Sequence, residues 1–241
     1  MLIDLHTHTY PLSRDSALDA DELVERSKAA GLDGIVLSEH DWAWHPEHVR
    51  ALAERHQFLV LHGIEVNTEF GHILVVGPPR YQYAMGQIEE LARRVRQHDG
   101  AMWAAHPYRR SYPTDWEDEA NRDAAVERGV QNPAYGLVTA LEIVNGRSTP
   151  RENRISQRIA ERLDLPGTAG TDSHRIEDIG RAATYFERDI RDVAALAEEI
   201  RAGRCWPVDL TRGELIEDAR YHGPPSRLAR TARADNAGED D

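Results

Sequence analysis

Histidine and acidic side chains recur along this chain where short apolar segments begin or end. The 241-residue sequence contains 12 histidines and 42 aspartates and glutamates. Those at or near expected strand ends are His6, His8, Asp15, His40, Glu65, His72, His106, Glu142, Asp172 and His174. Imidazole nitrogens and carboxylate oxygens are the ligands that Zn²⁺ and similar divalent cations take in proteins. The sequence therefore predicts a metal site that several segments build together.

The spacing within two of these segments supports the metal prediction. His6 and His8 stand two residues apart, so both side chains face the same side of an extended strand. Asp172 and His174 repeat that spacing late in the chain. An Asp-Ser-His segment alone is also typical of a turn, so the prediction depends on the whole set. Glu65 ends another expected strand, where its two oxygens can bridge two ions.

Apolar strand-like segments alternate with helical segments along most of the chain. The expected strands cover residues 2–10, 34–38, 58–66, 71–77, 101–105, 137–144, 167–171 and 182–186. The expected helices cover residues 19–30, 46–57, 87–98, 151–163 and 189–202. This alternation predicts parallel βαβ units, about seven of them, which is enough to close a barrel. Functional residues of such barrels gather where the strands end, so the histidines and acids should converge there.

Composition excludes several classes of protein. The net charge is -13, and all but one of the 29 basic residues are arginine. Because phosphate contacts require a basic face, we expect no stable nucleic-acid complex. No apolar run approaches the roughly 20 residues of a membrane span, and the N-terminus lacks the features of a signal peptide. The single cysteine, Cys205, excludes a disulfide framework, so we expect a cytoplasmic protein without a membrane partner; the oligomeric state stays open.

The chain shows no linker that would divide it into two domains. We expect residues 1–222 to form one barrel domain. Residues 109–133 are polar and acid-rich, which is typical of an insertion or a lid over the site. Residues 223–241 contain few apolar side chains, so we expect a disordered acidic tail.

The order of the motifs DLHTHT, SEHD, GIEVN, GHILVVG, AHP and GTDSH resembles that of the PHP superfamily, named for polymerase and histidinol phosphatase. The similarity runs from about Leu2 to Cys205 and is greatest to stand-alone PHP-domain metal-dependent phosphoesterases. It implies an α/β fold, a distorted (β/α)7 TIM-like barrel, with two or three divalent ions (Zn²⁺, Mn²⁺ or Fe²⁺) at its mouth. Ser16 stands where the family commonly has glycine, so the loop that carries Asp15 departs from the pattern.

The resemblance also implies which residues hold each ion. The residues around the first ion are His6, His8, Glu65 and Asp172. Glu65 would bridge to a second ion that His72 and His106 complete, and Asp15, His40 and His174 would hold a third.

Two adjacent ions can hold a bridging hydroxide, here placed by Glu65 and Asp172, which attacks phosphorus in line with the leaving oxygen. Arginine binds phosphate with two parallel hydrogen bonds, so Arg14, Arg109 and Arg147 are candidates for substrate binding, or else plain surface arginines.

Three further acids lie beside these ligands. Glu142 lies at a strand end and either orients an imidazole or is solvated in the barrel mouth. Glu39 and Asp41 flank His40, and the same two interpretations apply to them.

These residues predict a metal-dependent phosphoesterase that acts on a small phosphorylated substrate. The substrate would be a phosphomonoester, or a phosphate on a nucleotide or short oligonucleotide. Two alternatives remain: an amidohydrolase-like C–N hydrolase, and a non-catalytic PHP module that binds metal. A serine hydrolase is disfavoured, because Ser173 lies in no Gly-x-Ser-x-Gly elbow.

Overall fold

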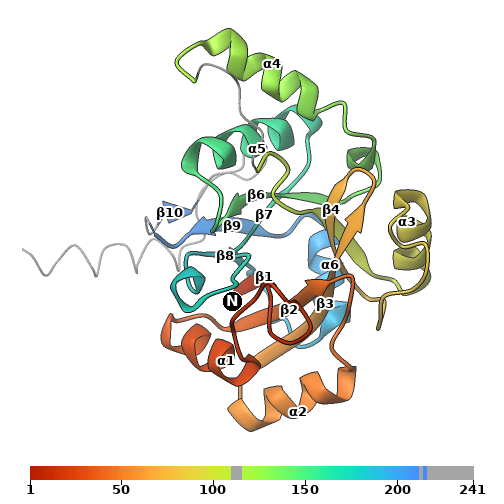
Figure 1. Cartoon of the computed structure of the whole chain (residues 1–241), viewed down its shortest axis with the longest axis vertical. Helices are drawn as coiled ribbons and strands as arrows, with labels where there is room; N and C mark the ends of the chain where they lie inside the picture. Colours follow the sequence, from red (N-terminus) through yellow and green to blue (C-terminus); the bar gives the residue numbers. More distant parts are fainter. Residues whose placement is uncertain (110–115, 212–213, 216–241) are drawn as a thin grey trace, which may run out of the picture.

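The computed structural model describes residues 1–109, 116–211 and 214–215, and these form a mixed α/β fold (Figure 1). The strands are β1 (Leu2–Thr7), β2 (Gly34–His40), β3 (Leu59–Thr68), β4 (Gly71–Val76), β5 (Ala101–Ala104), β6 (Ala140–Asn145), β7 (Gly167–Gly170), β8 (Ala182–Tyr185), β9 (Trp206–Asp209) and β10 (Glu214–Leu215). The helices are α1 (Ala20–Ala29), α2 (Pro46–His56), α3 (Ile88–Gln97), α4 (Glu119–Gly129), α5 (Pro150–Leu163) and α6 (Val193–Arg201). The strands form one sheet in the order β10-β9-β8-β1-β2-β3-β4-β5-β6-β7.

The sheet curls into a nearly closed barrel because the segment after β7 returns to β1. Thr7 and Ser173 form a parallel bridge. The N–H of His8 donates to the carbonyl of Ser173 at 3.1 Å, and the N–H of Asp172 donates to the carbonyl of His6 at 2.8 Å. This confirms the predicted barrel and places the first and last ligand segments side by side.

The prediction of parallel units throughout is wrong for part of the sheet. β1, β2 and β3 are parallel, as are β5, β6 and β7, but β4 is antiparallel to both of its neighbours. Only Glu69 and Phe70 separate β3 from β4, which is too short for a helical crossover and sufficient for a hairpin. Gly71 follows with φ of 108°, a backbone conformation that glycine adopts without steric cost. β8 is also antiparallel to β1, and β9 and β10 extend the sheet beyond the predicted strands.

Strand alternation decides which side chains enter the barrel. Ile64 and Val66 of β3 pack in one hydrophobic cluster with α3. Leu74 and Trp103 pack in a second cluster with α6. Glu65 pairs with Leu74 across the β3–β4 hairpin, so its side chain shares their face of the sheet. The sequence position between two apolar residues thus directs this carboxylate toward the barrel interior.

Helix α5 has the local signals that set its start and its packing face. Thr149 and Glu152 form a reciprocal capping box, and Pro150 occupies the first turn. Ile155 and Ile159, four residues apart, are completely buried. The helix therefore packs firmly beside β6 and fixes the loop between them.

The acid-rich segment 109–133 contains helix α4, which lies at the top of Figure 1 beside α5. Gly129 of α4 is so close to Ile159 that an added Cβ would lie 2.3 Å from its Cδ1. Residues 110–115 of this segment, and the predicted tail at 223–241, lie outside the described residues.

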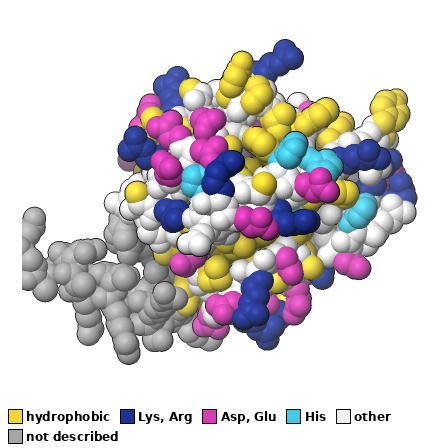
Figure 2. Space-filling model, turned by 90° about the horizontal axis from the view of Figure 1, so that it is seen from below, with side chains coloured by type: hydrophobic (Ala, Val, Ile, Leu, Met, Phe, Trp, Pro, Cys, Tyr) yellow, Lys and Arg dark blue, Asp and Glu magenta, His cyan; other side chains and the backbone are white. Residues whose placement is uncertain are grey.

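The molecular surface mixes charges of both signs. On the face shown in Figure 2, acidic and basic side chains are interspersed. Within the described part of the chain, no helix is both long and apolar enough to span a lipid bilayer.

Candidate metal centre

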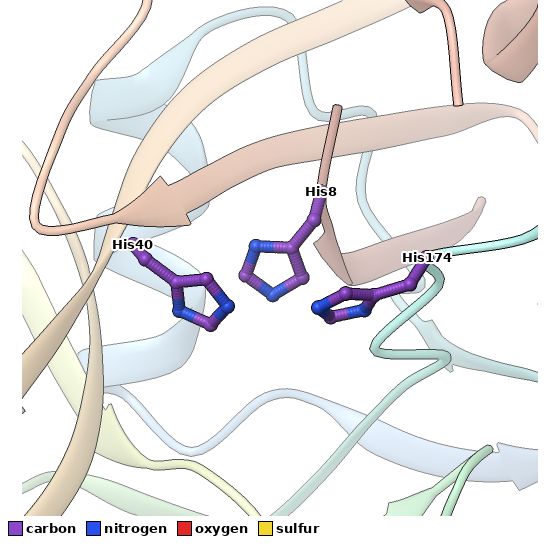
Figure 3. Close-up of side chains that lie close together, drawn as sticks. All are labelled: His8, His40 and His174. Atoms are coloured by element: carbon purple, nitrogen blue, oxygen red, sulfur yellow. The ribbon is translucent and has the colours of Figure 1, made fainter. Parts of the chain in front are cut away.

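Potential metal ligands gather at the end of the barrel where β1, β2 and β3 finish. They form three overlapping groups: His6, His8, Glu65 and Asp172; His40, Glu65 and His72; and His8, His40 and His174. Within each group the ligand atoms all lie within 4.8 Å of one another. Figure 3 shows the rings of His8, His40 and His174 turned toward one another. The structure thus brings together side chains that are more than 160 residues apart in the sequence.

Glu65 lies at the centre of this cluster. The imidazole nitrogens nearest its two oxygens belong to His6 (3.3 Å), His8 (3.2 Å), His40 (2.9 Å), His72 (2.7 Å) and His106 (3.1 Å). The first three lie nearest Oε2 and the last two nearest Oε1, so each oxygen faces its own set of histidines. Burial raises the pKa of Glu65, but the nearby histidines, His6 above all, hold it well below its usual range. The carboxylate is therefore placed and charged to contact two cations.

Three atoms of the cluster are buried without a properly oriented hydrogen bond: His6 Nε2, His8 Nε2 and Glu65 Oε2. Leaving a buried polar atom unsatisfied costs about 1–3 kcal/mol, so native proteins rarely do so without a reason. A cation bound between these atoms would satisfy all three. The donor set of imidazole and carboxylate fits Zn²⁺, Mn²⁺ or Fe²⁺.

Glu142 holds the ring of His6 from behind. Its Oε1 lies 3.0 Å from His6 Nδ1, and its Oε2 accepts from the His106 backbone N–H at 2.8 Å and from Asn145 Nδ2 at 3.0 Å. Burial alone lowers the pKa of His6, but Glu142 and then Glu65 more than compensate and raise it to about 10. Of the two interpretations of Glu142, its contact with His6 favours orientation of an imidazole, and its complete burial is incompatible with solvation.

Asp172 lies opposite Glu65, and two arginines face it. Its Oδ1 lies 3.5 Å from His6 Nε2 and 3.4 Å from His8 Nε2. The Arg109 guanidinium forms an ion pair with Asp172 Oδ2, and Arg147 Nη1 lies 3.9 Å from Oδ1. Positive charge thus borders the ligand cluster directly.

The third predicted substrate arginine, Arg14, precedes Asp15, which contacts the cluster. Arg14 is exposed, and within the part of the chain that the structure describes it forms no ion pair. Asp15, the next residue, has 60% of its side chain exposed, yet its Oδ2 lies 3.3 Å from His40 Nε2 and 3.1 Å from His174 Nε2. Burial, together with the charges of His8 and Arg147, lowers the pKa of His174 to about 3. A neutral imidazole is the form that binds a metal.

The structure groups some residues differently from the family pattern. His40 joins Glu65 and His72 in one ligand group, and His8 joins His40 and His174 in another. His106 is not in these groups, although its Nε2 is close to Glu65 Oε1. The overlap shows that His8, His40 and Glu65 each face more than one possible ion position.

Two of the predicted ligands have unusual backbone conformations. Asp172 has φ of 55° and His106 has φ of 30°, the left-handed region that non-glycine residues seldom adopt. Such strain is maintained only where the surrounding structure holds it, and it clusters at functional sites. For Asp172, the hydrogen bond from its N–H to the His6 carbonyl supplies part of that support.

Comparisons with known proteins agree with this fold. Residues 150–205 match the family described as PHP-associated, a segment that includes Asp172 and His174. Residues 1–76 match a family of unknown function, DUF6282. A comparison with curated proteins gave no match.

Three solved structures of similar fold are informative. One is a two-domain protein from Bacteroides vulgatus ATCC 8482 that contains a predicted PHP-like metal-dependent phosphoesterase (17% identity, TM-score 0.57); the match covers 90% of this chain and 66% of that one. Another is PsfC from Pseudomonas syringae PB-5123 (17% identity, TM-score 0.57), with 98% and 96% covered. The third is an amidohydrolase from Chromobacterium violaceum with bound sulfate and no metal (16% identity, TM-score 0.55), with 91% and 99% covered.

The family model that matches residues 150–205 and the fold shared with a PHP-like protein agree with each other. Both findings support a relation to the PHP superfamily. The matched segment 150–205 runs from α5 through β7 to α6. It therefore supplies Asp172 and His174, the two candidate ligands beside the end of β1.

Proposed function

We propose that this protein is a metal-dependent hydrolase of the PHP type that cleaves phosphoester bonds. The observation that carries the proposal is the juxtaposition of buried, unsatisfied ligand atoms with two arginines. His6 Nε2, His8 Nε2 and Glu65 Oε2 face one another, and Arg109 and Arg147 reach Asp172 at their edge. A phosphate at this edge would meet cations on one side and guanidinium groups on the other.

Divalent ions bound here would lower the pKa of a water molecule and polarise the phosphoryl group. The protein's own part is to hold the ligands in place. Glu65 spans the cluster, Asp172 faces it from the β7 side, and Glu142 fixes the ring of His6. Arg147 Nη1 also lies 2.8 Å from His174 Nδ1, so this arginine is close enough to contact a ligand of the cluster and a substrate oxygen.

A second candidate is hydrolysis of a C–N bond. The similar fold of the Chromobacterium violaceum amidohydrolase favours it. The same metal chemistry can polarise an amide carbonyl, whereas paired arginines are better matched to a phosphate than to a neutral amide. This difference makes phosphoester hydrolysis the first candidate.

The proposal is tested on purified protein, first by measuring its metal content. Metal-depleted protein is then reloaded with Zn²⁺, Mn²⁺ or Fe²⁺ and assayed against phosphomonoesters, nucleotides and a panel of amides and lactams. We expect metal-dependent release of phosphate, lost in His8→Ala and retained in His62→Ala, since His62 of β3 lies outside the three ligand groups. Hydrolysis of amides alone, or full phosphatase activity in metal-depleted His8→Ala, would overturn the proposal.

A further inference from the structure

A buried network lies behind His8, on the side of its ring opposite the metal cluster. His8 Nδ1 lies 3.1 Å from Ser13 Oγ, and Ser13 Oγ lies 2.5 Å from Glu39 Oε2. All three residues are at most 1% exposed. Neither Ser13 nor Glu39 belongs to the ligand groups, so the network has no evident role in holding a cation directly.

The other partners of Glu39 are groups that donate hydrogen bonds. Its oxygens accept from the backbone N–H of Thr9 at 3.0 Å, from the Thr9 hydroxyl, and from Trp44 Nε1 at 2.9 Å. Backbone and indole N–H groups can only donate. The carboxylate of Glu39 is therefore held as an acceptor, and the hydrogen in its bond with Ser13 comes from the serine.

A count of the hydrogens available to Ser13 then determines which ring nitrogen of His8 carries a hydrogen. A serine hydroxyl has one hydrogen to donate and two lone pairs that accept. Ser13 donates its hydrogen to Glu39 and accepts from the backbone N–H of His40 at 3.2 Å. Its remaining lone pair can only accept, so the hydrogen between Ser13 and His8 must belong to His8 Nδ1.

We infer that Glu39, acting through Ser13, fixes the neutral His8 ring as the Nδ1–H tautomer. In that tautomer the lone pair of Nε2 points toward Glu65 Oε2 and Asp172 Oδ1, which lie 3.2 and 3.4 Å away. Glu39 and Ser13 are thus positioning residues for the metal centre, and they do for His8 what Glu142 does for His6 by direct contact. The inference rests on the proposed function only in that a cation binds Nε2.

The test replaces Glu39 with Gln, which keeps the shape and supplies a hydrogen-bond donor. The amide can donate to Ser13, which frees the serine hydrogen for His8 Nδ1 and favours the Nε2–H tautomer. In ¹⁵N-labelled protein stripped of metal, long-range ¹H–¹⁵N spectra report the tautomer, with His8→Gln used to assign the signals. We expect Nδ1–H in the wild type, Nε2–H in Glu39→Gln, and Zn²⁺ affinity in chelator competition weaker by roughly 10–100-fold.

The matched control is Trp44→Phe, which removes a donor to Glu39 Oε1 and leaves the contact between Ser13 and Oε2 intact. We expect it to keep the Nδ1–H tautomer and near wild-type Zn²⁺ affinity. If Glu39→Gln does not fold, Ser13→Ala tests the same link, since it deletes a single oxygen and should abolish the preference for Nδ1–H. The inference would be overturned if the folded Glu39→Gln or Ser13→Ala protein kept the Nδ1–H tautomer and the wild-type Zn²⁺ affinity. It would also be overturned if Trp44→Phe lost as much Zn²⁺ affinity as Glu39→Gln. Because the spectra need neither metal nor substrate, this result is independent of whether the protein hydrolyses phosphoesters.

Discussion

The Arg109 guanidinium is paired with Asp172, a carboxylate that is only 1% exposed. The pairing places the guanidinium at the edge of the ligand cluster. An anionic substrate bound at this edge would be a second partner for it. Divalent ions at the cluster would also attract Asp172, so a phosphate bound beside them would lie close to the same guanidinium.

Replacing Arg109 with Ala should therefore impair substrate binding and spare metal binding. We expect KM for a phosphomonoester to rise by roughly 10-fold to 100-fold, the loss of one charge-assisted contact. Metal content should stay at the wild-type level, because no ligand is removed. Steady-state kinetics with Arg109→Lys as the comparison variant check this, and an unchanged KM would remove Arg109 from the substrate site.

Glu142→Gln should weaken metal binding without removing a ligand. The amide keeps the size of the side chain but loses the charge that holds His6 Nδ1 at 3.0 Å. We expect metal affinity to fall by roughly 10–100-fold. Chelator competition measures this, and Glu152→Gln, a buried change in the α5 capping box, is a control that should leave metal affinity unchanged.

Gly170→Ala should disturb the centre through packing alone. A Cβ at this position would lie 2.5 Å from His6 Cβ and 2.9 Å from Glu142 Oε1. Both groups must then move, so we expect lower metal affinity in a folded protein. Gly136→Ala is the control, since an added Cβ there meets no atom within 4 Å. Wild-type affinity in Gly170→Ala would show that the site tolerates displacement of His6.

Metal should stabilise the protein, because His6 Nε2, His8 Nε2 and Glu65 Oε2 are buried and unsatisfied without it. Chelation should lower the Tm, and readdition of metal should restore it. At free metal about 100 times the Kd, the expected gain is about 2.7 kcal/mol. Differential scanning calorimetry at several metal concentrations measures the effect, which should be absent in His8→Ala.

Acid should weaken an ion pair that anchors helix α6. Glu199 of α6 is buried and contacts Arg204 at 2.5 Å and Arg188 at 3.3 Å. The hydrogen bond from Arg204 lowers the pKa of Glu199 below its ordinary 4.5, so this pair stabilises the fold above that pH and the contribution is lost as pH falls.

Glu199→Gln should accordingly cost about 1 kcal/mol near neutral pH, with a smaller difference from the wild type in acid. Urea unfolding at several pH values measures it. Glu198→Gln, whose side chain is 62% exposed, should have little effect. If Glu199→Gln and Glu198→Gln lost the same free energy of unfolding at neutral pH, the stabilising role given to Glu199 would be wrong.

Much of the candidate site was predictable because strand periodicity is simple. The two-residue spacing of His6 and His8 predicted a shared direction, and both rings do face Glu65 Oε2. The barrel closure followed from the number of expected strands. The antiparallel β4 was missed, although the two-residue connection through Glu69 and Phe70 was a readable signal.

Other contacts had no sequence signal at all. Ser13 and Glu39 are 26 residues apart, and only the path of the loop after β1 brings them together behind His8. The alternative left open for Glu39, solvation in the barrel mouth, is wrong because the side chain is completely buried. Such contacts depend on loop geometry, which periodicity does not encode.

The pairing of β1 with the segment after β7 has a consequence for the order of events during synthesis. His6 and His8 leave the ribosome first, and Asp172 and His174 follow more than 160 residues later. A growing chain thus cannot complete the four-residue group of His6, His8, Glu65 and Asp172 until most of the domain has been made. Binding of the full set of cations is then a late event, because it requires that β1 has already paired with the segment after β7.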